Sequence, residues 1–221
     1  MLTSFGNTSH AVDASFVGSG LDGVGDFLKG PVTPGTFQPP GDALQAGFLA
    51  GEVRHPVMSF QLPVLAPDEV VVSASLSFQR TFNQGQPTGY TLDLDFIGVD
   101  PVELAASDFE APVVATVADD FVTPDDDGTP GTDPGFTGFF EILTFDVTSL
   151  ISSNYADGEF AAFRITVDGD PVPAAFNGYN FAANNATVVP ILTIETVIPE
   201  PASLALVALG GVALLGRRRT A

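Results

Sequence analysis

The sequence predicts an all-β protein, an antiparallel β-sandwich of jelly-roll type followed by a C-terminal hydrophobic helix. Apolar and polar residues alternate along several segments in the middle of the chain, and Gly, Pro, Asn and Asp interrupt these segments at short intervals. Ahead of residue 198 we find no amphipathic helix of any length. Alternation with a period of two is the pattern of a half-buried strand, and short strands separated by turn residues are typical of β-sandwiches.

The clearest strands are expected over 70–80 and 90–96. In the first, apolar residues hold the even positions from 70 to 78, and serine or glutamine holds 73, 75, 77 and 79. In the second, Asp93 and Asp95 are expected to point outward, opposite an inward face of Tyr90, Leu92, Leu94 and Phe96. Further strands are expected over 10–17, 57–62, 113–118, 138–147, 159–167 and 188–197.

Composition divides the chain into three regions. Residues 1–52 are rich in Gly and Pro, with a loop expected over 30–41, and should contribute the first strand or strands of the sandwich. Residues 53–197 form the sandwich domain, and residues 198–221 form a tail of a different kind.

The charge balance excludes one class of function. The chain has 27 acidic and seven basic residues and a formal net charge of −20. Three of the basic residues lie in the tail, which leaves Lys29, Arg54, Arg80 and Arg164 in the body. So acidic a protein repels nucleic acid and attracts cations. The absence of cysteine excludes disulfides and thiol chemistry, whereas nineteen Phe residues supply enough apolar mass for a core.

The tail has three zones in a fixed order. Pro199, Glu200 and Pro201 come first, and the two prolines prevent a helix from continuing through Glu200. Residues 202–216 are uncharged, and as a helix they would rise about 22 Å, short of a ~30 Å hydrocarbon core. Three arginines, Arg217, Arg218 and Arg219, then favour the cytoplasmic side and leave the body outside the cytoplasm. A core helix is the alternative, but it would need a polar face, and Ser203 is the only polar residue of the run. A permanent membrane anchor also remains open.

This order of zones resembles the PEP-CTERM sorting signal of Gram-negative bacteria, and the same tail resembles the ice-binding protein C-terminal domain. The resemblance covers about the last 25 residues. It implies transient anchoring in the inner membrane through residues 202–216, recognition of Pro199-Glu200-Pro201 by an exosortase, removal of the tail, and delivery to the outer surface or extracellular matrix. We do not infer ice binding, because the body has no regular array of threonines.

Residues 1–20 have neither a basic segment nor an apolar one of the kind found in export signals. A C-terminal sorting signal requires export. We therefore expect the natural start of the protein, with its signal peptide, to lie upstream of Met1.

The segment 145–151, with sequence FDVTSLI, combines a strand end with a turn that Asp146 or Thr148 can cap, after which Leu150 and Ile151 would pack on the core. It resembles the DVT signature of DNRLRE-type jelly rolls, which are similar to carbohydrate-binding modules. The aromatic residue that follows the turn in that family has Tyr155 as its nearest equivalent here. A strand end with a capped turn, without any family relationship, explains the same residues.

The sequence does not predict an enzyme. Its two histidines, His10 and His55, have no acidic neighbours, and the nucleophile, metalloprotease and phosphate-binding motifs are absent. A carboxylate pair of the glycosidase kind, drawn from Asp93, Asp95 and Glu141, is the alternative. With so many acids, such pairs arise by chance, and outward acids on strands are usually solvated.

One acidic loop has the composition of a calcium site. Within 122–135, Asp125, Asp127 and Asp133 offer the hard oxygens that calcium requires. Thr123 and Pro134 occupy positions where an EF-hand needs carboxylates, so the loop is not an EF-hand. The alternative is a solvated Asp/Pro/Gly loop, and no other cofactor is expected.

These features together predict an exported, exosortase-processed surface or matrix protein whose non-catalytic body acts in the exopolysaccharide or biofilm layer. The alternative is a carbohydrate-binding module that presents aromatics such as Tyr90, Tyr155 or Tyr179. A carbohydrate-active hydrolase is a third and weaker interpretation.

Overall fold

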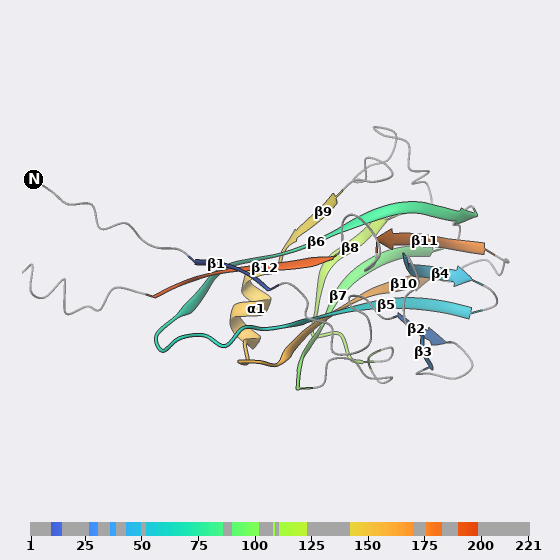
Figure 1. The fold of residues 1–221 in the computed structure, drawn as a ribbon. Helices are drawn as coiled ribbons and strands as arrows, with labels where there is room; N and C mark the ends of the chain where they lie inside the picture. The colour runs from blue at the N-terminus through green and yellow to red at the C-terminus, as the bar shows by residue number, and fades with distance from the viewer. Residues whose placement is uncertain are drawn as a thin grey trace, which may run out of the picture.

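A computed structural model describes residues 10–14, 27–30, 36–38, 43–49, 52–85, 90–101, 108, 111–122, 142–169, 176–182 and 190–198. Over these residues the chain forms antiparallel strands and one short helix, and the strands curve around a common interior (Figure 1). The prediction of an all-β fold is confirmed for this part of the chain.

The strands are β1 (His10–Ala14), β2 (Phe27–Gly30), β3 (Thr36–Gln38), β4 (Ala43–Leu49), β5 (Glu52–Gln61), β6 (Val70–Gly85), β7 (Tyr90–Asp100), β8 (Ala115–Val122), β9 (Ile142–Asp146), β10 (Phe160–Gly169), β11 (Phe176–Ala182) and β12 (Ile191–Val197). The helix is α1 (Thr148–Asn154). The strands expected in the middle of the chain are therefore present, with β5 and β6 longer than predicted. The loop expected over 30–41 contains β3, and β2, β4 and β11 were not predicted.

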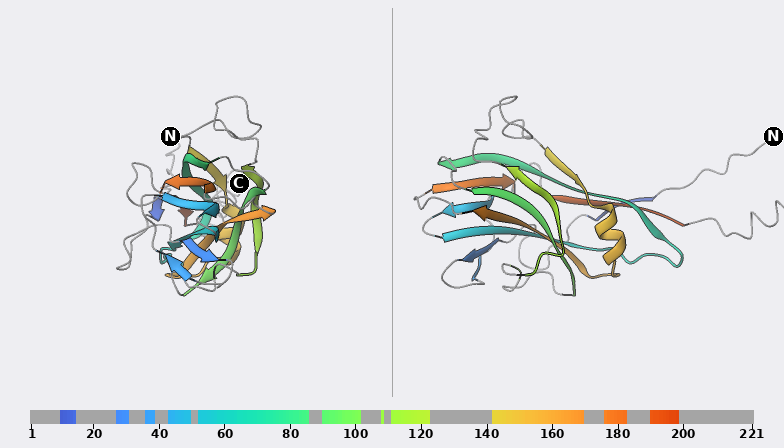
Figure 2. Two further views of the ribbon diagram at one scale, coloured as in Figure 1. Left: turned by 90° about the vertical axis from the view of Figure 1, so that its right-hand side faces the viewer. Right: turned by 180° about the vertical axis from the view of Figure 1, so that it is seen from behind.

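The strands form one curled sheet instead of the expected two-sheet sandwich. Its order is β1-β12-β6-β11-β4-β5-β10-β7-β8, with β2, β3 and β9 attached beside this path. The long strands make the sheet continuous: β6 pairs with β12 over its first half and with β11 over its second, and β5 links β4 to β10. The two halves of the curl face each other across the interior (Figure 2).

The core lies on the concave side of the curl. Tyr90 of β7 meets Tyr179 of β11 edge to face, with ring centroids 5.8 Å apart. Phe121 of β8 meets Phe78 of β6 in the same way, at 6.1 Å. Neither pair of strands is hydrogen-bonded together in the sheet, so these contacts join opposite walls. Apolar packing across the interior therefore closes the curl.

The turn between β9 and α1 has the packing predicted from FDVTSLI, with Ile151 in the core and Leu150 against it. The predicted cap differs, because Val147 occupies the N-cap position and makes no side-chain cap hydrogen bond. Asp146 Oδ1 accepts hydrogen bonds from the backbone N–H of Thr148 at 2.9 Å and from its hydroxyl at 2.6 Å. These bonds lower the pKa of Asp146, because they favour the carboxylate. The Thr148 Oγ1 also accepts the N–H of Ala74 on β6 at 2.9 Å, and Ile151 is buried. Asp146 and Thr148 thus attach the helix to the central strand, which gives the motif a structural role.

Among the described residues, no helix is long and apolar enough to cross a membrane. The expected C-terminal hydrophobic helix over 202–216 lies outside the described residues.

Candidate functional site

The sorting tail starts directly at the sheet. β12 ends at Val197, and Ile198, the last residue that the structure describes, is exposed. The end of β12 is therefore the point from which the tail continues, whereas Pro199, Glu200, Pro201 and Arg217–Arg219 lie outside the described residues.

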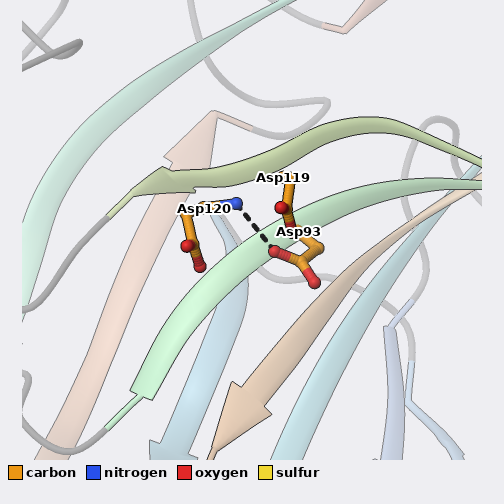
Figure 3. Close-up of side chains that lie close together, drawn as sticks. All are labelled: Asp93, Asp119 and Asp120. Atoms are coloured by element: carbon orange, nitrogen blue, oxygen red, sulfur yellow. Dashed lines mark hydrogen bonds between the residues drawn. The ribbon is translucent and has the colours of Figure 1, made fainter.

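A group of three carboxylates lies where β8 pairs with β7 (Figure 3). Leu92 pairs with Val122 and Leu94 with Ala118, so β8 carries extra residues between two successive partners on β7. This bulge places Asp119 and Asp120 beside Asp93, and the ligand oxygens of the three lie within 4.8 Å of one another. Asp120 has a φ of 49°, a left-handed conformation that aspartate tolerates, and its N–H donates to Asp93 Oδ1 at 2.8 Å.

The surroundings of Asp93 beside the bulge disfavour the ionised form of its carboxyl group. Desolvation is the largest cause that raises the pKa of this carboxyl group, and the nearby charges of Asp119, Asp168 and Asp95 raise it further. The hydrogen bond from Asp120 acts in the opposite direction. Negative charge is therefore concentrated at this edge of the sheet at neutral pH.

Asp93→Asn should stabilise the protein at neutral pH and leave its stability unchanged in acid. A raised pKa in the folded state means that stability falls as pH rises from the ordinary aspartate value of 3.8, until Asp93 is ionised in the folded state as well. The asparagine side chain does not ionise, so it avoids this loss of stability, and its carbonyl oxygen can still accept the hydrogen bond from the Asp120 N–H. We expect a gain on the order of 0.5 kcal/mol, because water screens such partly exposed charges. Urea unfolding of both proteins across the pH range measures it, and an equal gain at every pH would contradict the assigned cause.

The expected calcium ligands Asp125, Asp127 and Asp133 lie outside the described residues. The nearest of them in sequence, Asp125, follows Asp120 of the bulge by five residues. Calcium takes six to eight oxygen ligands, and three carboxylates supply only some of them. Groups of exposed carboxylates also occur on sheets that bind no metal, so calcium binding stays a prediction.

The expectation that Asp95 points into solvent is wrong, because it is only 3% exposed. Its Oδ2 accepts the hydroxyl of Thr166 on β10 at 2.6 Å, and its Oδ1 accepts the hydroxyl of Thr116 on β8 at 2.9 Å. Arg164 donates from Nε to the Thr166 hydroxyl at 3.1 Å. The outer face of β7 is thus covered here, and Asp95 belongs to a buried polar network.

The three tyrosines considered for sugar stacking make contacts within the protein. Tyr90 and Tyr179 are buried in the core. Tyr155 is half-buried and donates its hydroxyl to the carbonyl oxygen of Pro63 at 2.6 Å. Burial raises the pKa of both Tyr90 and Tyr155. Tyr90 and Tyr179 therefore present no ring face to a sugar, and the hydroxyl of Tyr155 is engaged by the turn that contains Pro63.

Sequence reasoning also missed the position of the arginines. Arg54, Arg80 and Arg164 are all buried, so they neutralise little of the acidic surface. The Cζ of Arg80 lies 5.1 Å from the centroid of the Tyr179 ring. Arg54 donates to Gln45, whose Nε2 donates to Asn180 at 3.2 Å, which links β5, β4 and β11. One signal in the sequence could have predicted this burial: the three arginines lie within predominantly apolar strands and have no acidic residue next to them.

The carboxylates considered for catalysis do not share one site. Asp93 lies half-buried beside the bulge of β8, Asp95 lies in the buried network, and Glu141 lies outside the described residues. His55 lies half-buried on β5. The absence of enzymatic activity therefore stays a prediction.

The described body is thus an all-β protein with a curled sheet, to which a separate tail is joined. Comparison with protein families matches residues 197–219 to the PEP-CTERM protein-sorting motif. The motif indicates an exported protein that is targeted to exosortase through C-terminal membrane anchoring. A comparison with curated proteins finds no match for the chain.

Proposed function

We propose that this protein is a cell-surface or extracellular-matrix protein whose non-catalytic body acts in the exopolysaccharide or biofilm layer after an exosortase removes its tail. The observation that carries the proposal is the sorting motif at residues 197–219, which begins at the last residue of β12. Every strand that the structure describes ends at or before Val197, so removal of a tail that begins at Pro199 leaves the described sheet complete.

The zones of the tail have distinct physical roles in this proposal. Residues 202–216 enter the membrane, and the positive charges of Arg217–Arg219 stay on the cytoplasmic side. Pro199 and Pro201 keep Glu200 out of a helix, so the enzyme meets an accessible main chain. The body remains outside the cytoplasm, where its acidic surface attracts cations of the polysaccharide layer. Bound cations can then bridge the protein to anionic sugars, which does not require an exposed aromatic platform.

Replacing Pro199, Glu200 and Pro201 together with alanine should block processing. Without the prolines, a helix can extend upstream from residue 202, and without Glu200 the enzyme loses the charged group of the motif. Mass spectrometry of the C-terminus in cells with exosortase should find the intact tail in the variant and a shortened chain in the wild type. Cells that lack the enzyme should retain the intact wild-type chain. Intact Arg217–Arg219 in the mature extracellular wild-type protein would contradict removal of the tail.

The matrix role has its own test. Secreted polysaccharide should retain the wild-type processed protein, and chelation of divalent cations should reduce this retention. A carbohydrate-binding module that contacts sugar directly would keep its retention after chelation. Absence of retention in both conditions would contradict the polysaccharide role while leaving export and processing intact.

A further inference from the structure

One end of the molecule is formed by the Leu62–Val70 turn, the start of β6 and the end of β12. We call it the tail pole. Hydrogen bonds hold the turn in place: Leu65 N–H donates to Asp157 Oδ1 at 3.0 Å, and Ala66 N–H donates to Glu69 Oε2 at 2.8 Å. The hydroxyl of Tyr155 also donates to the carbonyl oxygen of Pro63. In Figures 1 and 2 this turn and the end of β12 lie at the same end of the molecule.

The end of β12 is fixed to this pole. Thr196 pairs with His10 of β1 and with Val71 of β6, and Val197 pairs with Val70. The hydroxyl of Thr196 also donates to Glu69, the residue that closes the turn. The main chain is therefore held by the sheet up to the first residue of the sorting motif.

The connection between the pole and the membrane segment is short. Five residue steps separate Val197 from Ala202, and a fully extended chain covers no more than about 18 Å over that distance. The headgroup layer on one side of a bilayer is about 5–8 Å thick, and the connection has to cross it. While the tail is in the membrane, the pole thus stays within roughly 10 Å of the membrane surface. An enzyme that acts between them has to contact the pole.

The pole also concentrates exposed aliphatic side chains. Eight large hydrophobic residues are exposed among the described residues, and four of them lie here: Val64, Val70, Val72 and Ile198. Val64 is 75% exposed, the largest fraction of the eight. Exposed apolar groups gathered in one place indicate an interaction surface.

We propose that the tail pole is the surface by which the folded body docks on the outward face of the processing enzyme before the tail is removed. This inference rests on the proposed function, because it takes exosortase processing as given. The pole also carries exposed acids: Asp68 in the turn, Asp157, which accepts a hydrogen bond from the turn, and Glu195 near the end of β12. It therefore fits a partner face that is both apolar and neutral or basic. The same acids oppose binding to anionic lipid, which favours the enzyme over the bilayer as the partner.

The test follows the rate of tail removal from the full-length chain in cells that contain exosortase. Val64→Asp should slow removal several-fold, because the charge cannot be buried against an apolar partner. Val64→Lys should slow it as well, whereas a lipid partner would tolerate or favour the lysine. Val114→Asp is the matched control, because Val114 is an exposed valine next to β8, and it should be processed at the wild-type rate. Purified variants should keep their resistance to trypsin at the three buried arginines, which confirms that they are folded.

Wild type and Val64→Asp, each with a longer connection between the pole and the membrane segment, test whether the shortness of this connection brings the enzyme to the pole. A Gly/Ser spacer of about twelve residues between Ile198 and Pro199 adds roughly 20 Å and lets the enzyme act away from the pole. In chains with the spacer, Val64→Asp should no longer affect the rate. Equal rates for Val64→Asp and wild type without the spacer, or acceleration by Val64→Lys, would overturn the proposed docking. Failure of the wild-type chain to lose its tail would instead overturn the proposed function.

Discussion

Phe78→Ala is expected to lower the free energy of unfolding by about 4 kcal/mol, because it removes a buried ring from the point where the curl closes. Phe78 is fully buried on β6. Its ring contacts Phe121 of β8, Phe145 of β9 and Phe181 of β11, with centroid distances of 6.1, 5.5 and 5.6 Å. The variant loses the apolar contact of the ring and leaves a cavity between both walls of the sheet.

Urea unfolding at neutral pH measures this loss. Ile142→Ala is the control, since Ile142 lies on the neighbouring β9 but is 52% exposed, and it should cost no more than about 0.5 kcal/mol. A loss below about 1 kcal/mol for Phe78→Ala would mean that β8 does not pack over β6 in solution. Intermediate values would indicate that the walls relax into the cavity.

The strands that could be predicted are those whose side-chain pattern decides their structure. β6 and β7 have alternating faces, and both were located within a few residues of their observed starts. β4 and β11 have no such pattern, and Asn177, Gly178 and Asn180 within β11 are residues that usually indicate turns. These two strands pair with each other over seven residue pairs, so long-range pairing overrides the local preference.

The choice between a sandwich and one curled sheet could not be made from the sequence. Side chains alternate in the same way in both, because alternation depends only on the pleat of each strand. What distinguishes them is that β5 and β6 continue from one wall to the other, with 10 and 16 residues respectively. The predicted strand over 57–62 lacks the first five residues of β5, which include those that pair with β4, and the predicted strand over 70–80 lacks the last five residues of β6.

The candidate site shows a similar limit. The pattern placed Asp93 and Asp95 correctly on the face of β7 opposite its core residues. It could not show that β8, β10 and the carbonyl groups of Asp108 and Ala111 surround this face near Asp95, because that depends on contacts between distant segments. Nor could it show that Asp119 and Asp120 lie beside Asp93, since a bulge changes the register by an amount that no local pattern encodes.

Arg164→Met should lower the free energy of unfolding by about 3 kcal/mol, because hydrogen bonds from a buried charged group are among the costliest to remove. One guanidinium nitrogen of Arg164 donates to the carbonyl oxygens of Asp108 and Ala111, both at 3.0 Å, and Nε donates to Thr166. The arginine thus joins β10 to Asp108 and Ala111 and orients the threonine that donates to Asp95. Methionine fills much of the same volume without any donor.

Hydrogen exchange separates this role from a general loss of packing. Amide protection near Ala111 should fall more than protection in β6, because the guanidinium contacts the first region directly. Arg164→Lys is the informative companion, since it keeps the positive charge but cannot reproduce the planar arrangement of donors. We expect it to recover less than half of the loss. If lysine restored full stability, the charge alone would account for the effect, and the directed hydrogen bonds to Asp108 and Ala111 would contribute little to holding this outer face of the sheet together.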